Sequence, residues 1–358
     1  MRLSVLDQSP VPEGTAPAAA LQHTLELAAL ADRLGYHRYW VAEHHASPFQ
    51  AGSAPEVLIG QILARTSGIR VGSGGVLLPY YSPFKVAEVF RVLHALHPGR
   101  VDLGVGKAHL SKDPVVRALR RDAADPAGGD DFRDKVEELR TFLVGGGFPE
   151  GHPYGDLRPS PAAPGHPELW VLGSSVSSAE ATARAGLSYA YAHFLGPDHT
   201  VDAIRRYREE FVPHVVHGRP LGEPRVVLGI GVYCAETEDE AHALLAGHRL
   251  FRHRMDRGVM RPVPSTQQAI EELGAEVALA GDPGPGHPGH DPYVRNAVGT
   301  PEQVRAHLTA LAEVTGVDEV VLINSIHDHK ARLRCYELVA EVFGLAPRPE
   351  PAQHQTHP

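Results

Sequence analysis

The sequence predicts an α/β protein of the (β/α)8 type, a TIM barrel in which eight parallel strands are each followed by a helix. Short apolar runs bounded by turn residues alternate with amphipathic windows of helical period from one end of the chain to the other. Such an alternation is typical of a parallel sheet covered by helices. The length of 358 residues is one that barrels of this kind reach as a single domain.

Four strands and the helices between them are expected in the first part of the chain. The strands are expected at 3–7, 38–42, 69–77 and 100–105, and the helices at 18–34, 55–67 and 83–96. The helix at 18–34 carries leucine and alanine on one face and is closed by Gly35, a residue type that ends helices in the left-handed conformation. The Pro98-Gly99 pair separates the third helix from the fourth strand.

The second part of the chain repeats the pattern with one interruption. Strands are expected at 169–173, 188–193, 226–234 and 319–324, and helices at 132–143, 177–185, 200–211, 238–252, 301–314 and 330–343. The interruption is an insertion at 257–295, between the seventh and eighth strands, whose Gly/Pro/His-rich run at 281–290 cannot be regular. We therefore expect one domain over 1–346, followed by a disordered tail at 347–358 that is rich in Pro, His and Gln.

Composition indicates which kind of molecule the protein binds and in which cellular compartment it works. Charged residues make up 22% of the chain and the formal net charge is -9, which argues against a nucleic acid or an anionic membrane surface as the partner. Cys234 and Cys335 lie far apart without a metal-ligand spacing, as is typical of a reducing compartment. The N-terminal segment is too short for a signal peptide, and no apolar run is long enough to span a bilayer. We expect a cytoplasmic protein that acts on a small molecule.

The candidate catalytic residues are Glu43, His44 and His45, which close the second strand. In a (β/α)8 barrel, side chains at the carboxyl ends of the strands form the active site. A histidine titrates near neutral pH, and an adjacent carboxylate can fix its tautomer or hold it charged. A bland alternative, a strand-end glutamate beside two solvated histidines, stays open in a chain with 23 histidines.

Two further motifs at strand ends are candidate ligand sites. The run Gly72-Ser73-Gly74-Gly75 lies inside the third strand, where glycines mark a bulge or the close approach of a flat ligand. The run 173–178, which begins Gly173-Ser174-Ser175, joins a strand to a helix, so its amides and hydroxyls, Ser177 included, could bind a phosphate. Serines that only cap the helix are the alternative reading. Lys107, His193 and Asn324 follow other strands, and no cluster predicts a metal site.

These motifs also resemble the bacterial luciferase-like flavin-dependent monooxygenases over nearly the whole chain. The opening 3–10, the segment 34–45 that contains Glu43-His44-His45, the segment 71–79 with 82–88 after it, and the segment 298–304 are all similar to signatures of that family. The resemblance implies a TIM barrel with a site for reduced FMN (FMNH2) at its mouth. It also implies an insertion after the seventh strand, which could act as a lid and set substrate choice.

The resemblance implies roles for individual residues. Gly74-Gly75 lies where the family has a non-proline cis peptide under the flavin ring. His44 lies at the position of the acid/base, with Glu43 and His45 beside it. The remaining positions implied in cofactor binding are Ser174 and Ser177 with the Ser175 amide at the phosphate, Lys107 and Arg133 at the positions of phosphate-binding arginines, and His193 near the ring.

One departure from the family pattern concerns the segment after the fourth strand. Relatives usually have Arg-Ala-Pro-Gly there, whereas this chain has Lys107-Ala108-His109. A lysine keeps the positive charge but loses the planar fork that binds phosphate through two bonds. We interpret the change as tuning of flavin affinity or substrate contacts rather than as loss of the site.

The implied activity is oxygenation of a small organic substrate by O2 and FMNH2, with the FMNH2 supplied by a separate NAD(P)H:flavin reductase, because no second, nucleotide-binding domain is recognisable. Three alternatives stay open. The barrel could use deazaflavin F420 for hydride transfer, or it could bind flavin with little catalysis. It could also serve a partner assembly, since the family commonly forms homodimers through helices, here those at 55–67 and 83–96.

Overall fold

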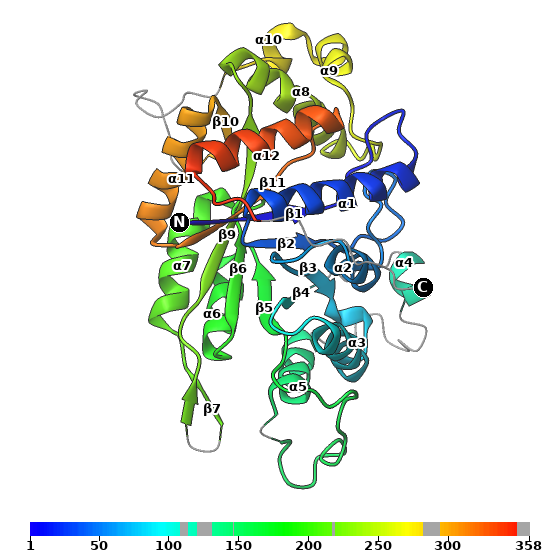
Figure 1. Cartoon of the computed structure of the whole chain (residues 1–358), viewed down its shortest axis with the longest axis vertical. Helices are drawn as coiled ribbons and strands as arrows, with labels where there is room; N and C mark the ends of the chain where they lie inside the picture. Colours follow the sequence, from blue (N-terminus) through cyan, green and yellow to red (C-terminus); the bar gives the residue numbers. More distant parts are fainter. Residues whose placement is uncertain (108–113, 120–130, 146, 217–218, 282–293, 349–358) are drawn as a thin grey trace.

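The computed structural model describes residues 1–107, 114–119, 131–145, 147–216, 219–281 and 294–348. Eight parallel strands close into a barrel, with helices packed around it (Figure 1). The barrel strands are β1 (Arg2–Asp7), β2 (Arg38–Val41), β3 (Arg70–Leu77), β4 (Val101–Gly106), β5 (Glu168–Gly173), β6 (Ser188–Ala192), β9 (Val226–Cys234) and β11 (Glu319–Ile323). Pairing of β6 with β9 closes the ring. The predicted (β/α)8 barrel is confirmed.

The helices follow the predicted alternation, with small shifts at their ends. They are α1 (Pro17–Leu34), α2 (Pro55–Leu63), α3 (Pro83–Leu96), α4 (Pro114–Leu119), α5 (Phe132–Val144), α6 (Val176–Arg184), α7 (Thr200–Glu209), α8 (Glu238–Met255), α9 (Thr266–Leu273), α10 (Ala275–Ala278), α11 (Pro301–Thr315) and α12 (His329–Phe343). Single turns of 3-10 helix lie at η1 (Leu78–Tyr80) and η2 (Pro197–His199).

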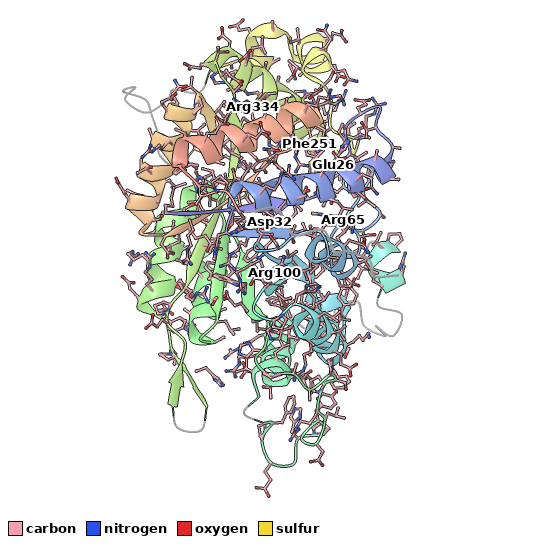
Figure 2. The ribbon with its side chains drawn as sticks, in the orientation of Figure 1. Glu26, Asp32, Arg65, Arg100, Phe251 and Arg334 are labelled. Atoms are coloured by element: carbon pink, nitrogen blue, oxygen red, sulfur yellow. The ribbon has the colours of Figure 1, made fainter. Side chains whose placement is uncertain are left out.

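Helix α2 ends four residues earlier than expected, because the Asp32 side chain accepts hydrogen bonds from the backbone N–H groups of residues 67–69. The Asp32 carboxylate accepts hydrogen bonds from the backbone N–H groups of Ser67, Gly68 and Ile69, at 2.6, 3.2 and 2.8 Å. Burial tends to raise the pKa of Asp32, but these three bonds outweigh it and the pKa is lowered. The bonds hold 67–69 in a turn that leads directly into β3 (Figure 2, where Asp32 is labelled).

Several elements were absent from the sequence prediction. The insertion between the seventh and eighth barrel strands contains α9 and α10, which pack on the end of α8 at the top of Figure 1. A ninth parallel strand, β10 (Asn296–Gly299), pairs with β9 outside the ring. An antiparallel hairpin of β7 (His214–Val216) and β8 (Arg219–Leu221) follows α7. Most of the run at 281–290, and most of the tail, lie outside the described residues.

Alternation of side chains along each strand divides the core into two parts. Outward-facing residues such as Tyr39 and Val41 pack under the helices, and the inward-facing ones fill the barrel. The interior cluster consists of Leu6, Trp40, Ala42, Trp170, Ala190, Val227, Val321 and Ile323. The two tryptophans meet edge to face with ring centroids 5.6 Å apart. The barrel is therefore a packed core whose chemistry is restricted to its ends.

A buried ion network fills the end of the barrel opposite the mouth. Arg38 on β2 is 0% exposed and donates to Asp102 of β4 at 2.7 Å and to Glu319 of β11 at 2.5 Å. Burial alone would lower the pKa of Arg38, but the two carboxylates raise it, so the guanidinium stays charged. The indole N–H of Trp40 donates to the same Asp102 carboxylate at 2.9 Å. One guanidinium thus joins three strands across the barrel.

Removing this guanidinium is expected to destabilise the fold strongly. In Arg38→Ala the buried carboxylate of Glu319 loses its close counter-charge and that of Asp102 keeps only Arg70, so we expect the free energy of unfolding to fall by about 3–5 kcal/mol. Urea unfolding followed by circular dichroism measures the loss. Arg184→Ala is the matched control, because Arg184 pairs with Glu210 at the surface with its side chain 60% exposed. Equal losses in the two variants would contradict the structural role given to Arg38.

Candidate active site

Glu43 collects three hydrogen bonds at the carboxyl end of β2. Its side chain is 1% exposed. One oxygen accepts the backbone N–H of Leu77 at 2.9 Å, and the other accepts the hydroxyl of Tyr81 and Nε2 of His45, both at 2.6 Å. The backbone of β3 and two side chains therefore fix the carboxylate at the barrel mouth, and the carboxylate in turn fixes the ring of His45.

Tyr81 was not identified from the sequence. It follows η1 and precedes Ser82, whose hydroxyl accepts the Lys85 N–H and caps α3. Burial, with the bond to Glu43 as a further cause, raises the pKa of Tyr81 well above its usual value, so the phenol keeps its proton and donates it. A tyrosine between η1 and a capped helix gives no local signal of a role. Only the approach of η1 to β2 brings it to Glu43.

His44 points to a different set of neighbours than His45. Its Nε2 lies 3.2 Å from the side-chain nitrogen of Gln50, and its Nδ1 is buried with no hydrogen-bond partner among the described residues. Burial, with a smaller effect of neighbouring His45, lowers the pKa of His44 from 6.5 to about 4. His44 is therefore neutral at neutral pH, and one of its nitrogens is left for a ligand.

The loop after His44 is pinned at several points. The N–H of His44 donates to the Gly52 carbonyl at 2.8 Å, and the N–H of Ala51 donates to the Ser9 carbonyl at 2.9 Å. Phe49 is buried and packs edge to face on Phe251 of α8, with ring centroids 4.9 Å apart. The loop after β2 is thereby joined to the loop after β1 and to α8, which makes it a rigid wall of the mouth.

The glycine run of β3 has the expected special backbone. The peptide bond between Gly74 and Gly75 is cis, as the family resemblance implies, and the pairing of β3 with β4 shifts register there. A Cβ on Gly75 would lie 2.7 Å from the Gly104 carbonyl oxygen. Ser73 is fully buried, and its hydroxyl donates to the Gly104 carbonyl at 2.8 Å and accepts the Gly104 N–H at 3.1 Å. Ser73 thus holds the bulge against β4.

The serine run after β5 begins a helix, as expected. Ser175 caps α6, because its hydroxyl accepts the N–H of Ser178 at 3.2 Å while its own N–H donates to the Ser178 hydroxyl at 3.3 Å. The hydroxyls of Ser175 and Ser177 lie 3.1 Å apart. Ser177 is exposed and Ser174 is half-buried, so the capping role of Ser175 is compatible with a ligand at the neighbouring hydroxyls.

The basic candidates lie on nearby parts of the rim. Lys107 is exposed directly after β4, and Arg133 is exposed in the first turn of α5. Strand β4 pairs with β5, so Lys107, which follows β4, and Gly173, which ends β5, lie at the same edge of the barrel. An added Cβ at Gly106 would meet no atom of the described residues within 4 Å. The segment 108–113, part of the unusual loop, lies outside the described residues.

His193 is enclosed by the chain itself. It is 0% exposed, and its ring nitrogens lie 2.7 Å from the Thr200 hydroxyl and 3.0 Å from the Val294 carbonyl oxygen. The ring therefore joins the end of β6 to the last residues of the insertion. This arrangement does not support the expectation that His193 binds a cofactor directly, because both nitrogens already have protein partners.

The candidate residues thus form two groups on one rim. Glu43, His44 and His45 lie beside the cis peptide at the ends of β2 and β3, and the serine run lies with Lys107 at the ends of β4 and β5. In the part of the chain that the structure describes, no group of three or more His, Cys, Asp or Glu side chains is arranged to hold a metal ion. No helix among those residues is long and apolar enough to cross a membrane. The donors suit an anionic group at one side and a proton-handling site at the other.

The pattern of the luciferase-like monooxygenase family matches residues 1–319. A match over most of the chain shows that the protein belongs to this family, and it confirms the resemblance read from the sequence motifs.

Three relatives are similar over nearly their whole length. MsnO8, known as an apo crystal structure, is 50% identical with a TM-score of 0.84, covering 97% of this chain and 99% of MsnO8. The uncharacterised protein YceB of Bacillus subtilis is 38% identical over 343 residues, 96% of this chain and 99% of YceB. N-acetyl-S-alkylcysteine monooxygenase of Bacillus subtilis is 37% identical over 351 residues, 97% of this chain and 100% of the relative.

More distant solved structures share the fold with two different cofactors. The oxygenating constituent of 3,6-diketocamphane monooxygenase from Pseudomonas putida, in complex with FMN, is 19% identical with a TM-score of 0.68, covering 95% of this chain and 97% of that chain. An F420-dependent secondary alcohol dehydrogenase is 15% identical with a TM-score of 0.60, covering 95% and 98%. The barrel alone therefore does not select the cofactor.

The buried, neutral state of His44 predicts a pH dependence of stability. Between about pH 6.5 and pH 4 the unfolded chain binds a proton at His44 that the folded chain does not, so the free energy of unfolding falls as the pH falls. We expect the wild-type protein to lose up to about 3 kcal/mol more than His44→Gln over this interval. Urea unfolding at a series of pH values measures the difference.

His199→Gln is the control, because His199 is exposed at the start of α7. It should follow the wild-type curve. A His44→Gln curve parallel to the wild-type curve would show that His44 takes up its proton equally well in the folded chain.

Proposed function

We propose that the protein is an FMN-dependent monooxygenase that uses FMNH2 and O2 to oxygenate a small organic substrate. The observation that carries the proposal is the buried Nδ1 of His44, which follows β2 at the barrel mouth and has no hydrogen-bond partner among the described residues. A buried polar nitrogen at a barrel mouth needs a partner, and a ligand supplies one. Membership of a monooxygenase family gives the reaction class.

The residues of the rim fit a flavin phosphate. The ammonium of Lys107 and the amides and hydroxyls of Ser174, Ser175 and Ser177 would hold the phosphate at the start of α6. Arg133 adds a positive charge from α5. Lysine binds phosphate as a point charge, so we expect weaker binding than an arginine fork gives.

The protein would contribute position, exclusion of water and proton handling. When bound, reduced flavin supplies the electrons for activation of O2. The Gly74-Gly75 backbone and the packed floor beneath it, with Leu6 and Trp40, would form one wall and keep water out. Glu43 would hold the ring of His45, and His44 would present its free nitrogen to the ligand.

The insertion is proposed to set substrate choice. Val263 pairs with the loop after β1, since its N–H donates to the Val11 carbonyl at 2.8 Å and its carbonyl accepts the Glu13 N–H at 2.7 Å. These bonds attach the insertion to the mouth, where a lid over a substrate would act. We propose a single domain over 1–346, a cytoplasmic location and a separate NAD(P)H:flavin reductase as the source of FMNH2.

The alternative functions have separate signatures. An F420-dependent hydride-transfer enzyme would reduce or oxidise its substrate without incorporating oxygen. A flavin-binding protein with little catalysis would retain its function in His44→Ala. Because an F420-dependent alcohol dehydrogenase shares the fold, the cofactor test includes reduced F420.

Anaerobic titration with FMNH2, followed by mixing with oxygenated buffer, tests the cofactor. We expect saturable binding and an oxidised flavin that appears more slowly than in free solution, because the mouth shields it from water. Stopped-flow absorbance measures both steps. With a turned-over substrate, mass spectrometry should find one labelled oxygen atom from 18O2 in the product.

Reduced riboflavin, which lacks the phosphate, is the matched ligand control and should bind about 10-fold or more weakly. In Lys107→Ala the preference for FMNH2 over reduced riboflavin should shrink. Binding of reduced F420 with no binding of FMNH2 would reject the proposal.

A homodimer through α2 and α3 is the proposed assembly. Val57 on α2 and Val92 and Leu96 on α3 are 61%, 46% and 69% exposed. Together with the partly buried Val89 they give these two adjacent helices an apolar outer face. Monomeric proteins seldom expose several large apolar side chains together.

A charge in this face should weaken the dimer. In Val57→Asp a carboxylate would be buried without a partner, and we expect the dimer dissociation constant to rise about 10-fold or more. Light scattering over a dilution series measures it. Val314→Asp on α11 is the control, because Val314 is 49% exposed on a helix that packs against α7 and α12, on the other side of the molecule in Figure 1. A monomeric wild-type protein would contradict the assembly.

A further inference from the structure

Gln50 is the neighbour that decides which nitrogen of His44 carries the proton. The side-chain nitrogen of Gln50 lies 3.2 Å from Nε2 of His44. An amide nitrogen carries two hydrogens and has no free lone pair to accept a hydrogen bond, so it can only donate. Nε2 of His44 must then be the acceptor, and it carries no proton.

In the structure the Gln50 amide has its oxygen toward Ser47 and its nitrogen toward His44. The Ser47 hydroxyl accepts the backbone N–H of Phe49 at 3.4 Å and donates to the Gln50 side-chain oxygen at 3.3 Å. With its oxygen facing Ser47, the amide turns its nitrogen toward His44. The backbone of the loop is held by the segment after β1. Gln50 forms an isolated antiparallel β-bridge with Pro10, and the Val11 N–H donates to the Phe49 carbonyl at 2.9 Å.

The proton of His44 must therefore be on Nδ1. The ring is neutral at neutral pH because burial lowers its pKa to about 4, so it carries one proton. Nδ1 is buried and makes no hydrogen bond to any residue that the structure describes. It is a donor without an acceptor among the described residues, at a buried position where an unpaired donor is costly.

His45 has the opposite arrangement. Its Nε2 lies 2.6 Å from the carboxylate of Glu43, which only accepts when ionised, so in the neutral ring Nε2 carries the proton and Nδ1 keeps its lone pair. The two adjacent histidines thus differ in role. His44 offers a hydrogen-bond donor, and His45 offers an acceptor that can take up a proton.

We propose that Gln50 is a positioning residue that fixes His44 in its Nδ1–H tautomer, so that His44 acts on the ligand as a hydrogen-bond donor and His45 takes the part of the base. The consequence for catalysis rests on the proposed function, whereas the tautomer itself does not. The ligand group that meets His44 must be an acceptor, such as an oxygen atom with a free lone pair.

Long-range proton–nitrogen NMR of 15N-histidine-labelled protein without any cofactor tests the tautomer directly, because protonated and unprotonated ring nitrogens have well-separated shifts. The signals of His44 are assigned by their loss in His44→Gln. We expect a protonated Nδ1 and an unprotonated Nε2 for His44, and the reverse for His45. A protonated Nε2 in His44 would overturn the proposal.

Two variants of Gln50 separate its hydrogen bond to His44 from the space that its side chain fills. In Gln50→Leu the donor is lost, and the Nε2–H form of His44 should appear. In Gln50→Glu the volume is kept but the carboxylate accepts, so His44 should change to Nε2–H completely. We expect turnover to fall about 10-fold or more in both, with KM within about twofold. Gln267→Leu, at an exposed glutamine of α9, is the control and should behave as wild type.

The outcomes separate this inference from the proposed function. If the tautomer is as expected and the protein neither binds FMNH2 nor consumes O2, the proposed function fails and the tautomer assignment stands. Wild-type turnover in Gln50→Glu, or an unchanged His44 tautomer in both Gln50 variants, would reject the positioning role even in a fully active enzyme.

Discussion

The charge on Arg38 is the constraint on which the rest of this barrel depends. Its guanidinium, 0% exposed, is placed by β2 between Asp102 of β4 and Glu319 of β11, strands that do not neighbour each other in the ring. Burying these charges is costly unless each is paired, so β2, β4 and β11 must meet in one register. A closed barrel satisfies this condition. Trp40, one inward position further along β2, is held to the same Asp102 and sets the packed floor under the mouth.

The strand register set around Arg38 determines which side chains lie at the mouth of the barrel. Glu43, His44 and His45 leave β2 where Val41 pairs with Ser73, directly beside the cis peptide of β3. The adjacent histidines then turn to different partners. His45 is held by Glu43, and His44 meets Gln50 from a loop that Phe49 pins to α8. A short sequence of titratable residues thus becomes two chemically distinct groups, because each is oriented by a different part of the barrel.

Much of the fold could be predicted because it depends on local periodicity. All eight barrel strands and their helices follow from the alternation of apolar and amphipathic segments. The strand β10 and the β7–β8 hairpin could not be predicted in this way, since each is short and depends on its partner. Among the candidate residues, the capping serine Ser175 and the Gly74-Gly75 peptide have the expected local geometry. The partner of the His193 ring could not be predicted, because the Val294 carbonyl that lies 3.0 Å from its Nε2 is 101 residues later in the chain.

The sequence by itself determined the fold class, the family and the strand ends that carry the titratable residues, because period, turn residues and motifs are properties of neighbours along the chain. Only the tertiary structure decided how those residues are used. Tyr81, which follows β3 and η1, donates to Glu43, which follows the neighbouring strand β2. Gln50 contacts His44 because the loop after β2 folds back on itself. Packing brings both pairs of atoms within hydrogen-bond distance. Protonation states and tautomers follow from burial and from such contacts, and neither is encoded in the residue type alone.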